Sequence, residues 1–182
     1  RPGSVRISAE EELLRVIPVI RALHKRFPGT LLSIDTYQSE VARAAVAEGV
    51  NIVNDISAGE MDTKMLEAVG TLGVPYICMH MKGRPETMQE SPMYEDVTRE
   101  VLDYFITRIN DCRNAGIKDI IIDPGFGFGK NIAHNFRILK DLASFKMLGC
   151  PILVGLSRKS TVYKTLHISA AEALNGTTVL NT

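Results

Sequence analysis

The sequence has only three cysteines, and their arrangement excludes two classes of protein. Cys78, Cys112 and Cys150 form no CxxC pair, and an odd number of cysteines does not suit a disulfide scaffold. We therefore expect reduced thiols and a cytoplasmic protein, with neither disulfides nor a cysteine zinc site. The sequence also lacks any apolar run close to the roughly 20 residues that a membrane span requires.

Net charge is absent as well, because 21 Lys and Arg residues balance 21 Asp and Glu residues. No long run of one sign occurs, so neither nucleic acid nor an anionic membrane is an expected partner. A chain of 182 residues that is 45% hydrophobic can bury a core, and we expect one domain over residues 1–182. The sequence opens on Arg-Pro-Gly without a methionine, so we do not expect residue 1 to be the natural start.

The most informative segment is residues 120–130, an apolar run that stops at Asp123 and continues as Pro-Gly-Phe-Gly-Phe-Gly-Lys. This pattern predicts a buried strand whose exit loop carries a carboxylate. It is not a nucleotide-binding loop, because Pro124 stands at the first glycine position and Asn131 at the hydroxyl position. The alternative interpretation of Asp123 is a structural turn cap.

Four other short apolar runs also end in polar residues, which favours one functional rim of a parallel sheet over a chance pattern. They are Ser33-Ile34-Asp35-Thr36, Ile52-Val53-Asn54-Asp55, Ile77-Cys78-Met79-His80 and Val154-Gly155-Leu156-Ser157-Arg158-Lys159. We therefore predict five strands at about 31–35, 51–56, 75–80, 119–123 and 152–156.

Helix signals separate the predicted strands. Ser8 with Glu11 predicts a capping box for a first helix, and Asp62 is the expected cap of a third. Other helices are expected at about 38–48, 97–112 and 134–142, with a last one starting at Ser169. This alternation is typical of an α/β fold with a parallel sheet and right-handed crossovers.

Polar residues at all five strand ends favour a (β/α)8 barrel over an open sheet, whose site would cluster at one switch point. A complete barrel usually takes about 250 residues. The predicted fold is therefore an incomplete TIM barrel.

Seven segments together resemble the dihydropteroate synthase family, and the resemblance spans the whole chain. They are Arg1-Pro2-Gly3, Ser33-Ile34-Asp35-Thr36, Asn54-Asp55-Ile56, Met79-His80-Met81-Lys82-Gly83 with Thr87-Met88-Gln89, Asp123 to Lys130, Gly155-Leu156-Ser157-Arg158-Lys159-Ser160 and Asn175-Gly176-Thr177. The resemblance implies a transferase of folate biosynthesis and a sulfonamide target. It would condense 6-hydroxymethyl-7,8-dihydropterin diphosphate with p-aminobenzoate and release pyrophosphate.

The same resemblance implies parts that these 182 residues lack. The family's first two strands, the first with an asparagine that helps to hold Mg²⁺ and diphosphate, would precede Arg1, and its last strand would follow Thr182. A Mg²⁺ cofactor is thus expected with its ligand outside the sequence, and no residue within it is assigned to metal. The family also implies a homodimer.

For the pterin, the resemblance and the chemistry of the side chains agree. A pterin offers a ring N–H beside an amine, and a carboxylate such as Asp123 accepts both in parallel. The remaining edge of the pterin ring offers both donors and acceptors, and the amide of Asn54 can pair with both. Asp35 and Lys159 are the expected catalytic residues, since Asp35 would also stabilise positive charge as diphosphate leaves. A turn-capping Asp35, a loop-bracing Asn54 and a solvated Lys159 are the structural alternatives.

For p-aminobenzoate, the resemblance implies that Ser160 binds the carboxylate while Phe128 and Pro2 flank the ring. Arg1 matches the arginine of a family loop. Ser160 at a helix start would also favour an anion, and its structural alternative is an N-cap. We interpret His80 as a buried residue that braces the following loop.

Two alternative functions remain. One is the methyltetrahydrofolate-binding barrel of a corrinoid methyltransferase, which shares the Asp, Asn and Asp positions but should lack the Ser-Arg-Lys-Ser segment. The other is a non-catalytic barrel that serves as a partner module in a bifunctional folate enzyme.

Overall fold

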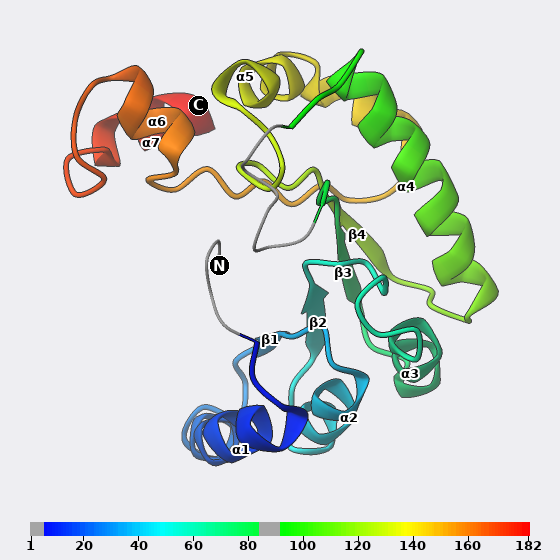
Figure 1. Cartoon of the computed structure of the whole chain (residues 1–182). Helices are drawn as coiled ribbons and strands as arrows, with labels where there is room; N and C mark the ends of the chain where they lie inside the picture. Colours follow the sequence, from blue (N-terminus) through cyan, green and yellow to red (C-terminus); the bar gives the residue numbers. More distant parts are fainter. Residues whose placement is uncertain (1–5, 84–91) are drawn as a thin grey trace.

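The computed structural model describes residues 6–83 and 92–182, in which helices and parallel strands alternate (Figure 1). The elements are α1 Ala9–Arg26, β1 Ser33–Asp35, α2 Ser39–Ala47, β2 Ile52–Asp55, α3 Met65–Leu72, β3 Tyr76–Met79, α4 Val97–Asn114, β4 Ile120–Asp123, α5 Ile132–Lys140, the 3-10 helix η1 Leu142–Leu148, α6 Ser160–Thr165 and α7 Leu174–Asn181. The predicted α/β order is confirmed. Within the described ranges, no helix is long and apolar enough to cross a membrane.

The four strands pair in parallel in their sequence order, β1-β2-β3-β4. Figure 1 shows α1 to α5 following the outside of this curved row, while α6 and α7 lie at the far end of the arc. A parallel sheet with helices on the outside is the arrangement of a (β/α)8 barrel, of which this chain contains a part.

The predicted fifth strand at 152–156 is wrong, because pairing there is reduced to one parallel bridge between Ile122 and Ile152. Its two hydrogen bonds run from the Ile122 N–H to the Pro151 carbonyl, 2.9 Å, and from the Leu153 N–H to the Ile122 carbonyl, 2.8 Å. The next bond of a parallel ladder would need an N–H from residue 124, which is a proline. The ladder therefore stops after a single residue.

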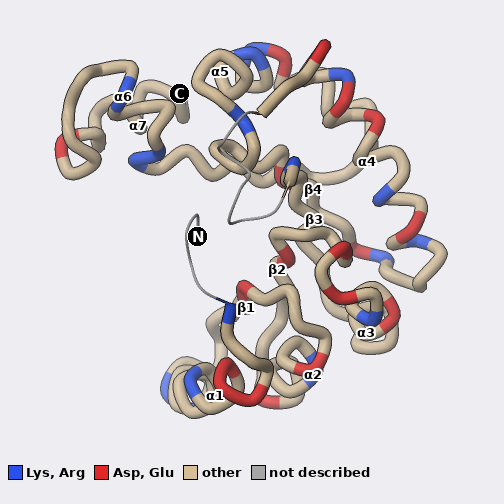
Figure 2. Tube along the Cα trace, in the orientation of Figure 1, with Lys and Arg blue, Asp and Glu red and all other residues tan. Residues whose placement is uncertain are grey.

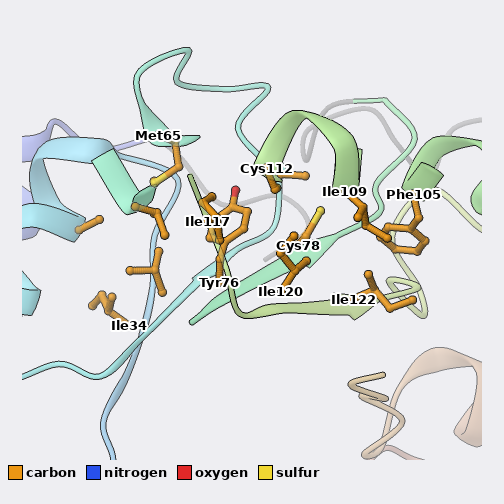
Figure 3. Close-up of a cluster of buried hydrophobic side chains, with 14 of the residues drawn as sticks. Ile34, Met65, Tyr76, Cys78, Phe105, Ile109, Cys112, Ile117, Ile120 and Ile122 are labelled. Atoms are coloured by element: carbon orange, nitrogen blue, oxygen red, sulfur yellow. The ribbon is translucent and has the colours of Figure 1, made fainter. Parts of the chain in front are cut away.

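Each strand turns alternate side chains to the two faces of the sheet. The helix-covered face holds the hydrophobic core, which Figure 3 shows in part. Strand residues of this core are Ile34, Val53, Tyr76, Cys78, Ile120 and Ile122, and they pack with Met65, Phe105, Ile109, Cys112 and Ile117 from the covering elements. All three cysteines are free thiols, and Cys78 and Cys112 are buried in this core.

The helix-start predictions are partly corrected. The Ser8 hydroxyl caps α1 by accepting from the Glu11 N–H at 3.1 Å, but the Glu11 carboxylate pairs with Arg15. Asp62 does bond at the start of α3, because its Oδ1 accepts from the N–H of Lys64 at 2.9 Å, but the N-cap residue is Lys64. Its Oδ2 accepts from the Ser39 N–H at 2.8 Å. Ser169 and Glu172 do bond to each other at 2.7 Å, yet α7 begins later, at Leu174.

Residues of positive and negative charge are interspersed along the chain (Figure 2). Asp55 is fully buried at the end of β2. Its Oδ1 accepts from the Ser57 N–H at 2.8 Å and the Ser57 hydroxyl at 2.7 Å, and its Oδ2 accepts from the Gly59 N–H at 2.8 Å and the Tyr76 hydroxyl at 2.9 Å. Burial raises the pKa of this carboxyl, and these hydrogen bonds oppose the rise. Asp55 therefore fixes the loop after β2.

We expect Asp55→Asn to lower the free energy of unfolding by about 1–3 kcal/mol, since one amide group cannot accept from all four donors and a buried donor is left unpaired. The exposed Asp119→Asn is the control and should stay within about 0.5 kcal/mol of the wild type. Urea unfolding measures both. Equal stability of the two variants would contradict a bracing role for Asp55.

Candidate functional site

The inner face of the sheet gathers the predicted carboxylates and amide. In the parallel register Asp35 lies beside Asn54, Asn54 beside Ile77, and Ile77 beside Ile121. Asp123 follows Ile121 by two residues and so points to the same face. The helix-facing core contains none of these five residues. Asp35, Asn54 and Asp123 therefore face the inside of the barrel arc, at the carboxyl ends of their strands.

Asp35 and Asn54 are a hydrogen-bonded pair across β1 and β2. The Asn54 Nδ2 donates to the Asp35 Oδ1 at 2.8 Å. The Asn54 Oδ1 is buried and has no hydrogen-bond partner among the described residues. A buried amide oxygen without a donor carries a free-energy cost that a bound N–H group would relieve. This atom thus has the geometry of an acceptor for a ligand.

Asp123 lies at the end of β4 and is 9% exposed. Its Oδ1 accepts from the Gly125 N–H at 2.8 Å, which is the turn cap of the structural interpretation. Burial raises the pKa of the carboxyl, while the Gly125 N–H, Lys159 and Lys130 oppose the rise. Asp123 is consequently a desolvated carboxylate held beside two cations, and the turn bond occupies one of its oxygens.

Lys159 reaches over the loop that follows β4. Its Nζ donates to the Phe126 carbonyl and lies 4.9 Å from the centre of the Phe128 ring. Burial lowers the pKa of the Lys159 amine, and the charge of Asp123 counters that effect. The alternative of a solvated Lys159 is therefore wrong, since the amine is desolvated among groups of the site.

Of the four residues predicted to bind p-aminobenzoate, the structure describes Phe128 and Ser160. Phe128 is half-buried, with the Lys159 amine against its ring. Ser160 is the first residue of α6, whose N-cap is Lys159, so the N-cap interpretation of Ser160 is wrong. Arg1 and Pro2 lie outside the described residues.

Sequence reasoning missed the role of Lys130, although this residue ends the predicted motif. Its side chain is 2% exposed, and its Nζ contacts the His80 Nδ1 at 2.8 Å. The predicted burial of His80 is confirmed, because His80 is 5% exposed, and its ring contacts Lys130 of the loop after β4. The loop that directly follows His80 lies partly outside the described residues, so its bracing by His80 stays a prediction. The signal available in the sequence was a lysine directly after a glycine-rich turn, which by itself does not predict burial.

No cluster of metal-ligating side chains occurs in the described parts of the chain. Within 6–83 and 92–182, His, Cys, Asp and Glu side chains form no group of three or more that could hold an ion. A Mg²⁺ cofactor with its ligand outside this sequence stays a prediction.

Residues 1–181 match the model of a family described as pterin binding enzyme. The chain belongs to the pterin-binding enzyme family. Over 178 residues it is 46% identical to the dihydropteroate synthase of Escherichia coli (strain K12), a match that covers 97% of this chain and 62% of that protein.

Solved structures of pterin-binding enzymes agree with this assignment. Yersinia pestis dihydropteroate synthase with a sulfonamide drug complex superposes with a TM-score of 0.94 at 39% identity, covering 99% of this chain and 66% of that one. Xanthomonas albilineans dihydropteroate synthase with 4-aminobenzoic acid gives 0.91 at 40% identity, covering 100% and 64%. The same protein in complex with 7,8-dihydropteroate gives 0.87 at 39% identity, covering 96% and 64%. The predicted TIM barrel is confirmed, and this chain spans less than two thirds of the Escherichia coli relative's length.

Glycine is required in the loop after β4. Gly125 has φ +68°, and a Cβ there would lie 2.0 Å from the His80 carbonyl oxygen. Gly149 has the same φ of +68° but no atom within 4 Å of such a Cβ. A substitution at Gly149 therefore tests the backbone conformation alone, whereas one at Gly125 tests the conformation together with the close contact to His80.

We expect Gly149→Ala to cost about 1–2 kcal/mol, the penalty of a left-handed conformation. Gly125→Ala should cost about 2–5 kcal/mol, because the displacement of the His80 carbonyl adds to that penalty. Urea unfolding of both variants measures the difference. Equal losses would mean that the contact between the loop and the end of β3 does not restrict residue 125.

Proposed function

We propose that this chain is the pterin-binding part of a dihydropteroate synthase. The enzyme would condense 6-hydroxymethyl-7,8-dihydropterin diphosphate with p-aminobenzoate to give 7,8-dihydropteroate and pyrophosphate. The observation that carries the proposal is the shared inner face of Asp35, Asn54 and Asp123, with Lys159 beside it. The complexes of related enzymes with 4-aminobenzoic acid and 7,8-dihydropteroate support it.

In the proposed complex, the Asp123 carboxylate accepts from a ring N–H and the neighbouring amine of the pterin. The unpartnered Asn54 Oδ1 accepts from a second edge of the ring. Lys159 donates to ring oxygen and nitrogen after leaving the Phe126 carbonyl. These contacts orient the pterin with its methylene group toward the second substrate.

In the reaction, the amine nitrogen of p-aminobenzoate forms a bond to the pterin methylene carbon. The bond from that carbon to the diphosphate oxygen breaks, the electron pair leaves with pyrophosphate, and the attacking amine loses a proton. Asp35 stabilises positive charge that develops on the pterin as diphosphate departs. Phe128 flanks the p-aminobenzoate ring and Ser160 binds its carboxylate, with Arg1 and Pro2 as the proposed contributions of the N-terminal loop.

Other properties of the whole protein follow as parts of the proposal. A Mg²⁺ ion would come with ligands from outside this sequence, and no step above depends on it. A homodimer and a cytoplasmic location remain predictions from the family resemblance.

Titration of the complete polypeptide that contains these residues tests the function. Binding of both the pterin diphosphate and p-aminobenzoate, with pyrophosphate released on mixing, is the expected result. Binding of methyltetrahydrofolate in their place would indicate a corrinoid methyltransferase barrel. Binding of none of these ligands would indicate a non-catalytic module.

We expect Asp123→Ala to weaken pterin binding by about 10- to 100-fold with the fold kept, because a charged hydrogen bond contributes about 1.5–3 kcal/mol. The exposed Asp119→Ala is the matched control. Since burial raises the pKa of Asp123 and only the ionised carboxyl accepts both donors, wild-type affinity should fall as the pH drops through that raised value. Calorimetry from pH 4 to pH 8 measures both effects, and wild-type affinity in Asp123→Ala would refute this role.

We expect Phe128→Ala and Ser160→Ala to raise the KM for p-aminobenzoate more than they change pterin affinity, since each removes a contact to the second substrate. Phe27→Ala, at a side chain that is 52% exposed, serves as the control and should leave both constants unchanged. Steady-state kinetics with each substrate varied in turn gives the constants. A change confined to the pterin would show that the two pockets are assigned in the wrong order.

A further inference from the structure

Lys130 has a buried amine with a complete set of acceptors. Its Nζ lies 2.8 Å from the His80 Nδ1, 3.0 Å from the Gly125 carbonyl oxygen and 3.0 Å from the Phe128 carbonyl oxygen. The His80 carbonyl oxygen is a more distant contact at 3.4 Å. An ammonium group has three N–H donors and cannot accept a hydrogen bond. The three shorter contacts therefore provide one acceptor for each N–H.

These acceptors belong to two different strand ends. His80 directly follows β3, whereas Gly125 and Phe128 are the two ends of the turn after β4, which is closed by the Phe128 N–H donating to the Gly125 carbonyl at 3.0 Å. One amine thus binds both ends of the turn and ties them to the neighbouring strand end. The amine therefore contacts the backbone of Phe128 directly.

The surrounding charges give the amine a second effect. Asp123 at the end of β4 attracts it, and Lys159 before α6 repels it. Burial lowers the pKa of Lys130 to about 7. Burial also lowers the pKa of His80, and the positive charges of Lys130 and Lys82 lower it further. A neutral His80 ring can accept at Nδ1. In return, the positive charge of Lys130 opposes the burial-induced rise in the pKa of Asp123.

A residue that only fills space in the core would need neither the three hydrogen-bond donors nor the positive charge of Lys130. A buried cation costs free energy that an apolar side chain of similar length avoids. A methionine would fill the same space without donors or charge.

We propose that Lys130 is a positioning residue for both substrate sites. Its ammonium group holds the Gly125–Phe128 turn against His80, which places Phe128 for the second substrate, and its charge favours the ionised form of Asp123 for the first. This inference rests on the proposed function and deepens it.

Two variants and one control in the complete polypeptide test the proposal. Lys130→Met removes donors and charge, Lys130→Gln removes the charge and keeps a donor, and Lys140→Met removes an exposed lysine at the end of α5. We expect Lys130→Met to raise the KM for p-aminobenzoate by about 10- to 100-fold, as expected for a lost charged hydrogen bond. Lys130→Gln should raise it less, and Lys140→Met should leave it unchanged.

The pH dependence separates charge from packing. In both Lys130→Met and Lys130→Gln, the pH below which pterin affinity falls should move upward, because Asp123 loses a nearby cation and becomes easier to protonate. The control should keep the wild-type profile. Hydrogen exchange at the Phe128 amide should be faster in Lys130→Met than in the wild type, and it reports the turn without any substrate.

A folded Lys130→Met variant with an unchanged KM and an unmoved pH profile would overturn the proposal. A fall in kcat alone would also overturn it. If Lys130→Met does not fold, the pH profile and the amide exchange of Lys130→Gln decide in the same way. Failure of the proposed function would be seen separately, because the wild type would then bind neither substrate. In that case the amide exchange would still test the contact of Lys130 with the turn.

Discussion

Backbone hydrogen bonding between β1, β2, β3 and β4 determines which side chains share a face, and the site depends on that register. A shift of one residue in β4 would turn Asp123 into the helix-covered core and Ile122 toward the inside of the barrel. Asp35, Asn54 and Asp123 come from three strands and meet on one face only because every strand runs in the same direction and in register. The large apolar core on the opposite face stabilises that register.

The sequence was sufficient for the positions where a strand ends and a polar residue follows. Apolar runs that stop at Asp35, Asn54 and Asp123 predicted the strands closely, since a buried parallel strand has few compatible sequences. It failed at residues 152–156, where the same pattern gives a single bridge. The reason lies partly in the partner strand, because Pro124 cannot donate the next ladder bond. A pattern within one segment does not contain that information.

Interactions between distant residues account for what the sequence did not predict. The burial of Lys130 depends on His80, fifty positions earlier in the chain. The side chain of Asp62 accepts from the Lys64 N–H directly before α3, and it also accepts from the Ser39 N–H at the start of α2. In both cases a residue with local partners also takes a partner from another strand-helix unit, and only the assembled arc brings these groups together.

Burial acts in opposite directions on the three charged groups at the end of β4. It raises the pKa of Asp123 and lowers the pKa of Lys130 and of Lys159, so desolvation alone would favour the neutral form of each. The attraction between Asp123 and each lysine opposes this, whereas the two lysines repel each other, and the ionised state of one group therefore depends on the other two. Lys130 is held by fixed acceptors, whereas Lys159 donates to the Phe126 carbonyl and stacks beside Phe128. The site thus combines one lysine that is held by protein acceptors with one that, in the proposed complex, would exchange its backbone acceptor for the pterin, and the charge of Asp123 acts on both.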